Sequence, residues 1–316
     1  MSDRRIVVLA GGVGAARFLT GLVQVAAPSE ITVIVNTGDD RDFFGLRVCP
    51  DLDILTYTLA GRIRTDTGWG LEGDTFTCLQ ELRRFRDDTW FQLGDRDLAT
   101  HLHRSERLRQ GATLSAVTRE ITLAFGLEIE LLPMSDDPAP TMLVRSGGKR
   151  CDFEEYLVRD GAPDDIREVD LSAARSARPA PGVLEAIAGA ERLLVCPSNP
   201  VVSIGTIRAV SGVEEQLRAR GDAVAVSPLI GRAPVKGPAD RLLPAFGVEV
   251  SSTGVAELYL PIAAGMLIDE ADRDEAAGIE ALGLRVRTAE SLMRTPEVAA
   301  ELARTALELA AEGAEA

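Results

Sequence analysis

Hydrophobic positions along this chain form short β-branched runs that are separated by longer segments with helical spacing. The runs that predict strands lie at residues 5–10, 31–36, 192–196, 223–227, 267–269 and 284–287. Apolar residues recur at helical spacing at 15–26 and 204–220, and residues 296–310 read as a closing helix. Strands and helices that alternate in this way predict a mostly parallel, doubly wound sheet covered on both faces, which is a Rossmann-like α/β fold.

The middle of the chain departs from this alternation. Helical spacing covers residues 79–86 and 107–125, and a turn-rich segment follows them. A short hairpin is expected at residues 142–153, around Gly147 and Gly148. The middle therefore reads as a helical insertion rather than as further repeats of strand and helix.

A length of 316 residues can bury a substantial core in either one or two domains. The sequence shows no internal repeat and no low-complexity linker. We therefore expect residues 1–316 to form a single α/β domain. Its Rossmann-like core would cover about 1–60 and 190–290, and the helical insertion about 61–189.

Composition and charge narrow the class of partner rather than the fold. The formal net charge is −15, and binding of nucleic-acid phosphates requires a basic face, so no nucleic-acid partner is expected. A nucleotide is still compatible, because a few local donors can hold a diphosphate inside an acidic protein. No window approaches the ~20 apolar residues of a membrane-spanning helix, and the first apolar run resembles a strand more than a signal peptide. We expect a cytoplasmic protein without a membrane partner.

The first predicted strand ends in Gly11-Gly12-Val13-Gly14, directly before a predicted helix. Glycines let the backbone approach a phosphate, and the helix start offers free N–H groups and the positive end of the helix dipole. The turn lacks the Lys-Ser/Thr pair of a Walker loop, and Arg17 stands where a dinucleotide fingerprint has its third glycine. A phosphate-binding turn and a tight structural turn both remain open interpretations of these residues.

Acidic residues follow the next predicted elements. Asn36, Asp39 and Asp40 come after the second strand, and Asp51 and Asp53 precede the next apolar helical run. A single Asp before a helix is often only a cap. Because loops after parallel strands meet at one edge of the sheet, these carboxylates can converge on a ligand. Magnesium prefers oxygen ligands and bridges carboxylates to phosphates, so the cluster favours a Mg²⁺-dependent site.

A further polar cluster lies at a predicted helix start, where Asp95, Arg96, Asp97 and His101 fall within seven residues. A capped helix with a surface ion pair would also explain these residues, and such a pair contributes little to stability. The functional interpretation is a polar acceptor pocket, with Arg96 as a clamp for a phosphate or a ring.

Later turns also carry polar groups. Ser135 and Asp136 lie in the turn-rich segment of the middle region, and Ser198 and Asn199 directly follow a predicted strand. Such residues at the carboxyl end of a strand can bind a base or a ribose, but they are also the usual turn residues. Lys236 lies in a Gly/Pro-stiffened segment after another strand, where it could meet a phosphate.

Seven motifs, in this order, resemble the 2-phospho-L-lactate transferase (CofD/FbiA) family of coenzyme F-420 biosynthesis. After the opening glycine turn they are Val35-Asn36-Thr37-Gly38-Asp39-Asp40, Pro50-Asp51-Leu52-Asp53, Gly94-Asp95-Arg96-Asp97-Leu98-Ala99-Thr100-His101, Met134-Ser135-Asp136-Asp137, Pro197-Ser198-Asn199-Pro200 and Ser227-Pro228-Leu229-Ile230-Gly231. Each motif alone is unspecific, but seven in register are strongly specific. The resemblance runs from the first strand to about Leu292.

The resemblance implies a Rossmann-like transferase of substituted phosphate groups that requires Mg²⁺. The donor in this family is a guanosine diphosphate linked to a small acid, namely lactate or, in many bacterial members, enolpyruvate; glycerate is a third candidate. The terminal ribityl hydroxyl of the deazaflavin Fo attacks the acid-bearing phosphorus, GMP leaves, and (dehydro) coenzyme F-420-0 forms. Family members are commonly dimers, so a homodimer is expected.

The resemblance also suggests residue roles. Asp53 and Gln92 would contact Fo, although archaeal members carry lysine in the place of Gln92. Asp40 and Asp53 are the candidate metal ligands, Asp53 and Arg96 the candidate catalytic residues, and Asp53 could instead orient or deprotonate the ribityl hydroxyl. The other candidate substrate contacts are Gly12, Val13 and Gly14 for the phosphates, Ser198 and Asn199 for the guanosine, and Asn36, Asp95, His101, Ser135 and Asp136 elsewhere in the site.

Two other classes of protein remain as alternatives. A non-catalytic regulator of the gluconeogenesis-factor-like group shares the glycine-rich start and binds nucleotide sugars. Residues 94–101 favour the transferase, because a regulator that only binds has no need of an acceptor pocket. A nicotinamide oxidoreductase rests on the glycine turn alone, since the second strand ends without the acidic residue that binds the ribose.

Overall fold

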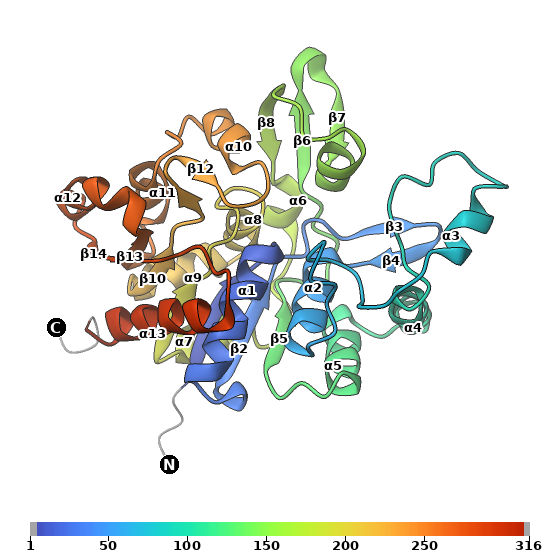
Figure 1. Cartoon of the computed structure of the whole chain (residues 1–316), viewed down its shortest axis with the longest axis horizontal. Coiled ribbons are helices and arrows are strands. Elements are labelled where there is room, and N and C mark those ends of the chain that lie inside the picture. The colour runs from blue at the N-terminus through green and yellow to red at the C-terminus, as the bar shows by residue number, and fades with distance from the viewer. Residues whose placement is uncertain (1–4, 313–316) are drawn as a thin grey trace.

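A sheet of seven parallel strands lies at the centre of the computed structural model, which describes residues 5–312 (Figure 1). The strand order is β14-β13-β10-β9-β1-β2-β5. The strands are β1 (Ile6–Ala10), β2 (Ile31–Val35), β5 (Glu130–Pro133), β9 (Arg192–Val195), β10 (Ala223–Val226), β13 (Ala263–Asp269) and β14 (Arg285–Ala289). The predicted Rossmann-like α/β fold is therefore confirmed.

Both faces of the sheet are covered by helices. Successive side chains of a strand point to opposite faces, so each strand contributes to two buried cores. In β1, Val7 and Leu9 belong to one buried core and Val8 and Ala10 to the other. The first core is closed by α7 (Val183–Gly189), α8 (Ile204–Ala209), α9 (Val213–Arg220), α10 (Ala239–Ala245) and α11 (Ser252–Tyr259). The second is closed by α1 (Gly12–Val25), α2 (Pro50–Leu59) and α13 (Pro296–Glu312), and α1 and α13 lie side by side in Figure 1.

Two stretches that were predicted as single helices are each divided by a glycine. The 204–220 stretch forms α8 and α9, with Gly212 at φ +81° between them. The 107–125 stretch is shared by α4 (Asp97–Arg109) and α5 (Leu114–Ala124), with Gly111 at φ +90° between them. A residue with positive φ cannot continue a right-handed helix, and glycine takes this conformation without strain.

The middle region holds more than the expected helices. It contains α3 (Thr77–Leu82), α4 and α5, but it also supplies β5 to the central sheet. A separate three-stranded sheet, in the order β7-β6-β8, forms a lobe at the top of Figure 1. Its strands are β6 (Met142–Arg145), β7 (Arg150–Asp152) and β8 (Ile166–Asp170). The predicted hairpin around Gly147 and Gly148 is confirmed, since β6 and β7 pair antiparallel.

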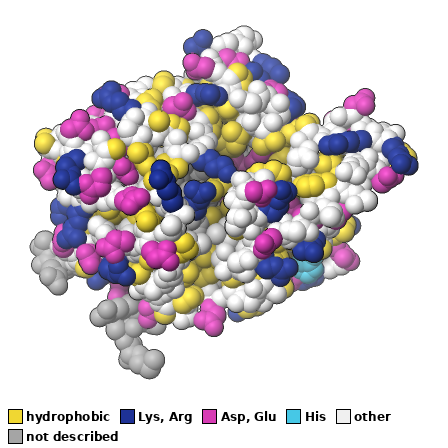
Figure 2. Space-filling view, in the orientation of Figure 1, with side chains coloured by type: hydrophobic (Ala, Val, Ile, Leu, Met, Phe, Trp, Pro, Cys, Tyr) yellow, Lys and Arg dark blue, Asp and Glu magenta, His cyan; other side chains and the backbone are white. Residues whose placement is uncertain are grey.

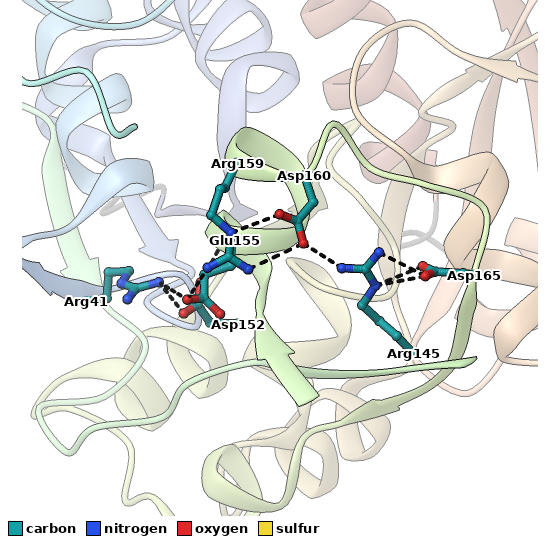
Figure 3. A network of polar contacts seen from close by, with 7 residues as sticks. All are labelled: Arg41, Arg145, Asp152, Glu155, Arg159, Asp160 and Asp165. Atoms are coloured by element: carbon teal, nitrogen blue, oxygen red, sulfur yellow. Dashed lines mark hydrogen bonds and ion pairs between the residues drawn. The ribbon is translucent and has the colours of Figure 1, made fainter. Parts of the chain in front are cut away.

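A chain of alternating charges joins this lobe to the hairpin of β3 (Arg41–Phe43) and β4 (Leu46–Val48) (Figure 3). It runs, in order, through Arg41, Glu155, Arg159, Asp160, Arg145 and Asp165, with Asp152 as a second partner of Arg41. The side chains of these residues are only 13–31% exposed, so water screens their charges less than those of surface pairs. The network thus ties the segment that carries Glu154 to the β3–β4 hairpin.

The remaining elements are short. They are η1 (Pro28–Glu30), η2 (Ser146–Gly148), η3 (Glu155–Arg159), α6 (Ser172–Ser176), β11 (Leu229–Ile230), β12 (Ala233–Pro234), η4 (Glu270–Glu275) and α12 (Ala276–Ala281). None of the helices within residues 5–312 combines the length and the apolarity that crossing a bilayer requires.

Candidate active site

The strand order reverses between β1 and β9, and the loops that follow these two strands meet there. The N–H of Gly11 donates to Ser198 Oγ at 3.0 Å, and Ser198 Oγ donates to the Gly11 carbonyl at 2.8 Å. Open α/β sheets bind ligands beyond the carboxyl ends of their strands at such a reversal. The structure therefore joins two of the predicted motifs, which lie 187 residues apart in the sequence, at the expected place.

Close contacts and backbone conformation both require glycines in the first loop. A Cβ on Gly14 would lie 2.3 Å from the carbonyl oxygen of Pro197, and one on Gly11 would lie 2.7 Å from Asp51 Oδ2. Gly12 has φ +74°, which side chains rarely adopt. The loop thus lies against both the β9 loop and the start of α2, with no room for larger residues.

A cavity of about 270 Å³ opens at this loop, and we call it the glycine-loop cavity. Its lining includes Gly12, Val13, Gly14 and Arg17, the acidic residues Asp39, Asp51 and Glu154, and the later polar residues Ser198, Asn199, Ser227, Lys236 and Ser291. Free N–H groups at the start of α1 and the dipole of this helix favour an anion here. Among the predicted contacts, Gly12, Val13, Gly14, Ser198 and Asn199 line this cavity.

Asn36 links two of the carboxylates at the floor of this cavity. Its amide nitrogen donates to Asp39 Oδ2 at 3.1 Å and to Asp51 Oδ2 at 2.9 Å, although Asn36 itself is completely buried. The second oxygen of Asp39 is buried without a hydrogen-bond partner in the described structure. One carboxylate from each of the two predicted acidic clusters therefore faces the glycine loop.

The buried carboxyl groups of Asp39, Asp51 and Glu154 lie close enough to influence one another. Burial raises the pKa of Asp51 to about 6, although hydrogen bonds from Asn36 and the Gly12 N–H oppose the shift. Burial and the nearby charges of Asp51 and Glu154 raise the pKa of Asp39 well above its usual value. Burial, with the charge of Asp51, also raises the pKa of Glu154 to about 8. Such a cluster is stabilised by protons or by a cation.

The donor set fits a Mg²⁺ ion that is completed by its ligand. Within residues 5–312, no group of three or more His, Cys, Asp or Glu side chains forms a ready-made metal site. Asp39 and Asp51 are held together by Asn36, and one oxygen of Asp39 lacks a partner. Magnesium is commonly bound by one or two carboxylates plus phosphate oxygens and water, which matches this incomplete arrangement.

A second cavity, of about 240 Å³, adjoins the first, and we call it the aromatic cavity. Tyr57, Trp69 and Phe91 are its aromatic residues, and Gln92 and Asp53 are among its polar ones. Figure 2 shows hydrophobic side chains in the hollow between the β6–β8 lobe and the part of the molecule that carries α3. The two cavities share six lining residues, which are Val13, Pro50, Ile54, Glu154, Leu157 and Lys236.

A buried polar network supports the aromatic cavity from behind. Arg104, only 2% exposed, pairs with both carboxylate oxygens of Asp53 and contacts His101 Nδ1 at 3.2 Å. His101 Nε2 lies 3.2 Å from Asp97, which also accepts a 2.6 Å bond from Tyr57 Oη. Burial opposes ionisation of Asp97, but the adjacent His101 ring and the hydrogen bond from Tyr57 outweigh it and lower its pKa. The network fixes the orientation of Asp53.

The predicted metal pair is placed differently from Asp39 and Asp51. Asp53 lines the aromatic cavity and is engaged by Arg104. Asp40 lines neither cavity; its pKa is raised to about 8 by burial, against a hydrogen bond from Cys49 and the charge of Arg104. Asp40 and Asp53 thus lie in environments that differ from those of Asp39 and Asp51, and spacing along the sequence could not distinguish them.

Several other predicted contacts lie outside both cavities. Arg96 is exposed and donates to the Glu72 carbonyl, and Asp95 accepts from the N–H groups of Thr77 and Cys78 at the start of α3. These two residues stabilise loops and helix starts. The remaining members of this group are His101 in the buried network, Asn36 between the carboxylates, Ser135 bonded to the Arg178 carbonyl, and Asp136 bonded to Ser115.

Other lining residues were missed by the sequence analysis. Glu154 lies at the shared wall of the two cavities, and Trp69 and Phe91 close the aromatic one. Arg104, the partner of Asp53, was also missed. No sequence pattern distinguishes a buried Arg on a polar helix from an exposed one, and none assigns an isolated aromatic residue in a loop to a cavity. Only the tertiary contacts reveal these roles.

The fold and the site define an α/β enzyme with two adjoining cavities at the carboxyl edge of its sheet. Residues 6–289 match the family model described as 2-phospho-L-lactate transferase CofD, and the chain belongs to this family of transferases.

Its relatives align over almost their whole length. A phosphoenolpyruvate transferase of Kitasatospora aureofaciens is 48% identical, with 97% of this chain and 98% of that protein covered. A 2-phospho-L-lactate transferase of Methanosarcina mazei is 39% identical, with 94% and 98% covered. The crystal structure of a UPF0052 family protein from Bacillus halodurans shares the fold, with a TM-score of 0.63 at 16% identity over 97% of this chain and 99% of that one.

Proposed function

We propose that this transferase moves a phospho-acid group from a guanylyl-diphospho donor to the terminal ribityl hydroxyl of the deazaflavin Fo. The products would be GMP and (dehydro) coenzyme F-420-0. The observation that carries the proposal is the shared wall between the glycine-loop cavity and the aromatic cavity. A group transferred between two bound substrates needs such adjacent sites, whereas a regulator that only binds a nucleotide does not.

The glycine-loop cavity suits the donor. Backbone N–H groups at Val13 and Gly14 lie at the start of α1, where the helix dipole favours a diphosphate. Ser198 is already bonded to the loop, so the guanosine part would extend beyond it toward Asn199, Ser227 and the other side of the cavity. The predicted roles of these residues are kept in the proposal.

The aromatic cavity suits the deazaflavin. Trp69 and Phe91 offer ring faces for the planar isoalloxazine-like system, and Gln92 offers an amide at the cavity wall. Asp53, held by Arg104 from behind, is oriented to accept a hydrogen bond from the ribityl chain. In this arrangement the terminal hydroxyl would reach the shared wall, where the phosphorus of the donor lies.

In the reaction, the ribityl oxygen forms a new bond to the acid-bearing phosphorus, and the bond from that phosphorus to GMP breaks. The hydroxyl proton is released to a carboxylate or to water, and Asp53 is our candidate acceptor. Mg²⁺, held by Asp39 and Asp51, would supply charge neutralisation on the diphosphate. We favour this pair over Asp40 and Asp53 because both of its carboxylates line the cavity of the glycine loop.

For the acid, we favour enolpyruvate over lactate. The relatives that share 46–48% identity with this chain are named phosphoenolpyruvate transferases, and the 2-phospho-L-lactate transferases among the relatives share 39%. The corresponding donor would be enolpyruvyl-diphospho-guanosine.

The test is a direct assay with Fo, MgCl₂ and the enolpyruvyl, lactyl or glyceryl donor in parallel. Product masses and GMP would be measured by liquid chromatography and mass spectrometry. We expect GMP and the mass of dehydro coenzyme F-420-0 only when the enolpyruvyl donor, Fo and Mg²⁺ are all present. Tight binding of a uridine sugar, with no turnover of any guanylyl donor, would contradict the proposal.

A further inference from the structure

Lysine is rare in this chain, and one of its two lysines lies at the shared wall of the cavities. The lysines of the sequence are Lys149 and Lys236, whereas arginine supplies the other basic side chains. Lys149 belongs to the β6–β7 turn, and Lys236 follows β12 and lines both cavities. Of the six residues shared by the two cavities, Lys236 and Glu154 are the ionisable ones, and Lys236 is the cation.

Lys236 crosses to a loop that is distant in the sequence. Its Nζ donates to the Thr67 carbonyl oxygen at 2.9 Å, and a Cβ on Gly68 would lie 3.2 Å from Nζ. The loop between Ile63 and Leu71 is closed by a bridge between these two residues, and it carries Trp69 in the wall of the aromatic cavity. The position of Trp69 is therefore tied to that of the Lys236 ammonium.

The charges around Lys236 favour an incoming anion. Arg17, a second cation of the glycine-loop cavity, acts on it, and burial together with this charge lowers the pKa of Lys236. Within residues 5–312, its recorded hydrogen bond is to a neutral carbonyl rather than to a carboxylate. A lysine ammonium has three donors, so two of them are left for phosphate oxygens while the bond to Thr67 is kept.

We propose that Lys236 binds the diphosphate of the donor while it holds Thr67, so that donor binding fixes Trp69 over the aromatic cavity. Donor binding would then strengthen acceptor binding, because it anchors the lysine that already holds the loop of Trp69 in the wall of the aromatic cavity. This inference rests on the proposed function and adds a coupling between its two sites.

Fluorescence can test the coupling, because Trp69 and Trp90 are the tryptophans of the sequence. In a Trp90→Phe background, we would titrate GDP with MgCl₂ and record both the GDP affinity and the emission of Trp69. We expect GDP to shift the emission. Lys236→Met should weaken GDP binding about tenfold or more and remove the shift, and Lys149→Met is the matched control that should change neither.

A second measurement needs no variant at the site. Limited acetylation of the unmodified protein, followed by mass spectrometry, should show that GDP with Mg²⁺ protects Lys236 and leaves Lys149 unprotected. Unchanged acetylation of Lys236, or unchanged GDP affinity with a retained emission shift in Lys236→Met, would overturn the coupling. If Lys236→Met alters the emission of the free protein while GDP affinity stays the same, Lys236 only fastens the loop, and the proposal is also wrong. Failure of the unmodified protein to bind GDP at all would instead contradict the proposed function.

Discussion

The two cavities share a wall but are built from different material. The glycine-loop cavity rests on backbone and short side chains in loops that follow β1, β2 and β9, and Arg17, Glu154 and Lys236 line it from other segments. The aromatic cavity is formed by large side chains on α2 and on loops outside the central sheet, such as Trp69 and Phe91. In the first, atoms of neighbouring loops approach so closely that a single Cβ would collide. In the second, side chains fill the space and can adjust.

This difference has a physical consequence for how each side responds to change. A wall made by the backbone of parallel strands is fixed by hydrogen bonds along the whole sheet, so it offers a preformed site for an invariant group such as a diphosphate. A wall made by side chains from separate segments depends on ion pairs and packing, as with Asp53 and Arg104 or the network of Figure 3. We therefore expect substitutions outside the shared wall to act mainly on one of the two cavities.

The largest effect is expected for Gly14→Ala. Its methyl group would lie 2.3 Å from the Pro197 carbonyl, so the glycine loop and the β9 loop must separate. Displacing a substrate by about 1 Å can cost ~100-fold in rate, and overpacking costs about 1–3 kcal/mol of stability. Turnover and thermal unfolding would be measured beside Gly189→Ala, whose added methyl group meets no atom within 4 Å. Full activity of Gly14→Ala would mean that the loop does not hold the donor.

Replacing each of the two aspartates of α2 should have different effects on stability, because Asp53 is the partner of a buried arginine and Asp51 is repelled by other carboxylates. Asp53→Asn leaves Arg104 buried without its partner, which typically costs about 3–5 kcal/mol of unfolding free energy. Asp51→Asn removes repulsion among the carboxylates, so stability should be kept while turnover falls about 10–100-fold and more Mg²⁺ is needed. Denaturant unfolding and Mg²⁺ titrations measure both. Equal destabilisation by the two variants would show that Asp51 is not held under repulsion.

Trp69→Ala tests the aromatic cavity. Loss of this ring should raise the KM for Fo about tenfold, since aromatic stacking contributes roughly 0.5–1.5 kcal/mol beyond buried area. The Mg²⁺ requirement should stay unchanged. The control is Phe85→Ala, which removes an aromatic ring that is 83% exposed and lines neither cavity. An unchanged KM for Fo in Trp69→Ala would place the deazaflavin elsewhere.

The raised pKa of Glu154 predicts a pH-dependent stability. Burial raises it to about 8 from a usual value of 4.5, so between these values the folded chain keeps a proton that the unfolded chain has lost. Stability from this proton is present below about pH 4.5 and decreases as pH rises toward 8. Glu154→Gln should therefore raise the Tm at pH 8 by about 2–4 °C or more and change it little at pH 5. Exposed Glu257→Gln should show no such difference; an equal shift at both pH values would contradict the prediction.

The smallest effect is expected for Arg96→Ala. The motif alone suggests that Arg96 clamps a phosphate or a ring, but its guanidinium donates to the Glu72 carbonyl at the surface, outside both cavities. Surface polar contacts of this kind contribute about 0–1 kcal/mol. Steady-state assays should show less than about a threefold change in turnover and in the KM for Fo. A larger loss would restore Arg96 to the acceptor site.

Much of the fold was predictable from the sequence because it depends on local patterns. Apolar runs marked six of the seven central strands, and the closing helix begins at Pro296 as expected. The exception is β5, whose short run of Leu131 and Leu132 follows a helix and carries no alternation of its own. The divisions at Gly111 and Gly212 were missed because the apolar spacing continues across them, while the backbone angle does not.

The sequence by itself determined much of the chemistry of the glycine-loop cavity, since glycines and acidic residues in loops that follow parallel strands must lie at one edge of the sheet. Only the tertiary structure decided that Asp39 rather than Asp40, and Asp51 rather than Asp53, lines this cavity, because that depends on how the loop and the helix α2 are oriented by their long-range contacts. It also decided the wall of the aromatic cavity, where Trp69, Phe91 and Glu154 come from segments whose meeting depends on packing and on buried ion pairs. Local sequence patterns determine the helices and strands, and long-range contacts determine which side chains meet in the cavities.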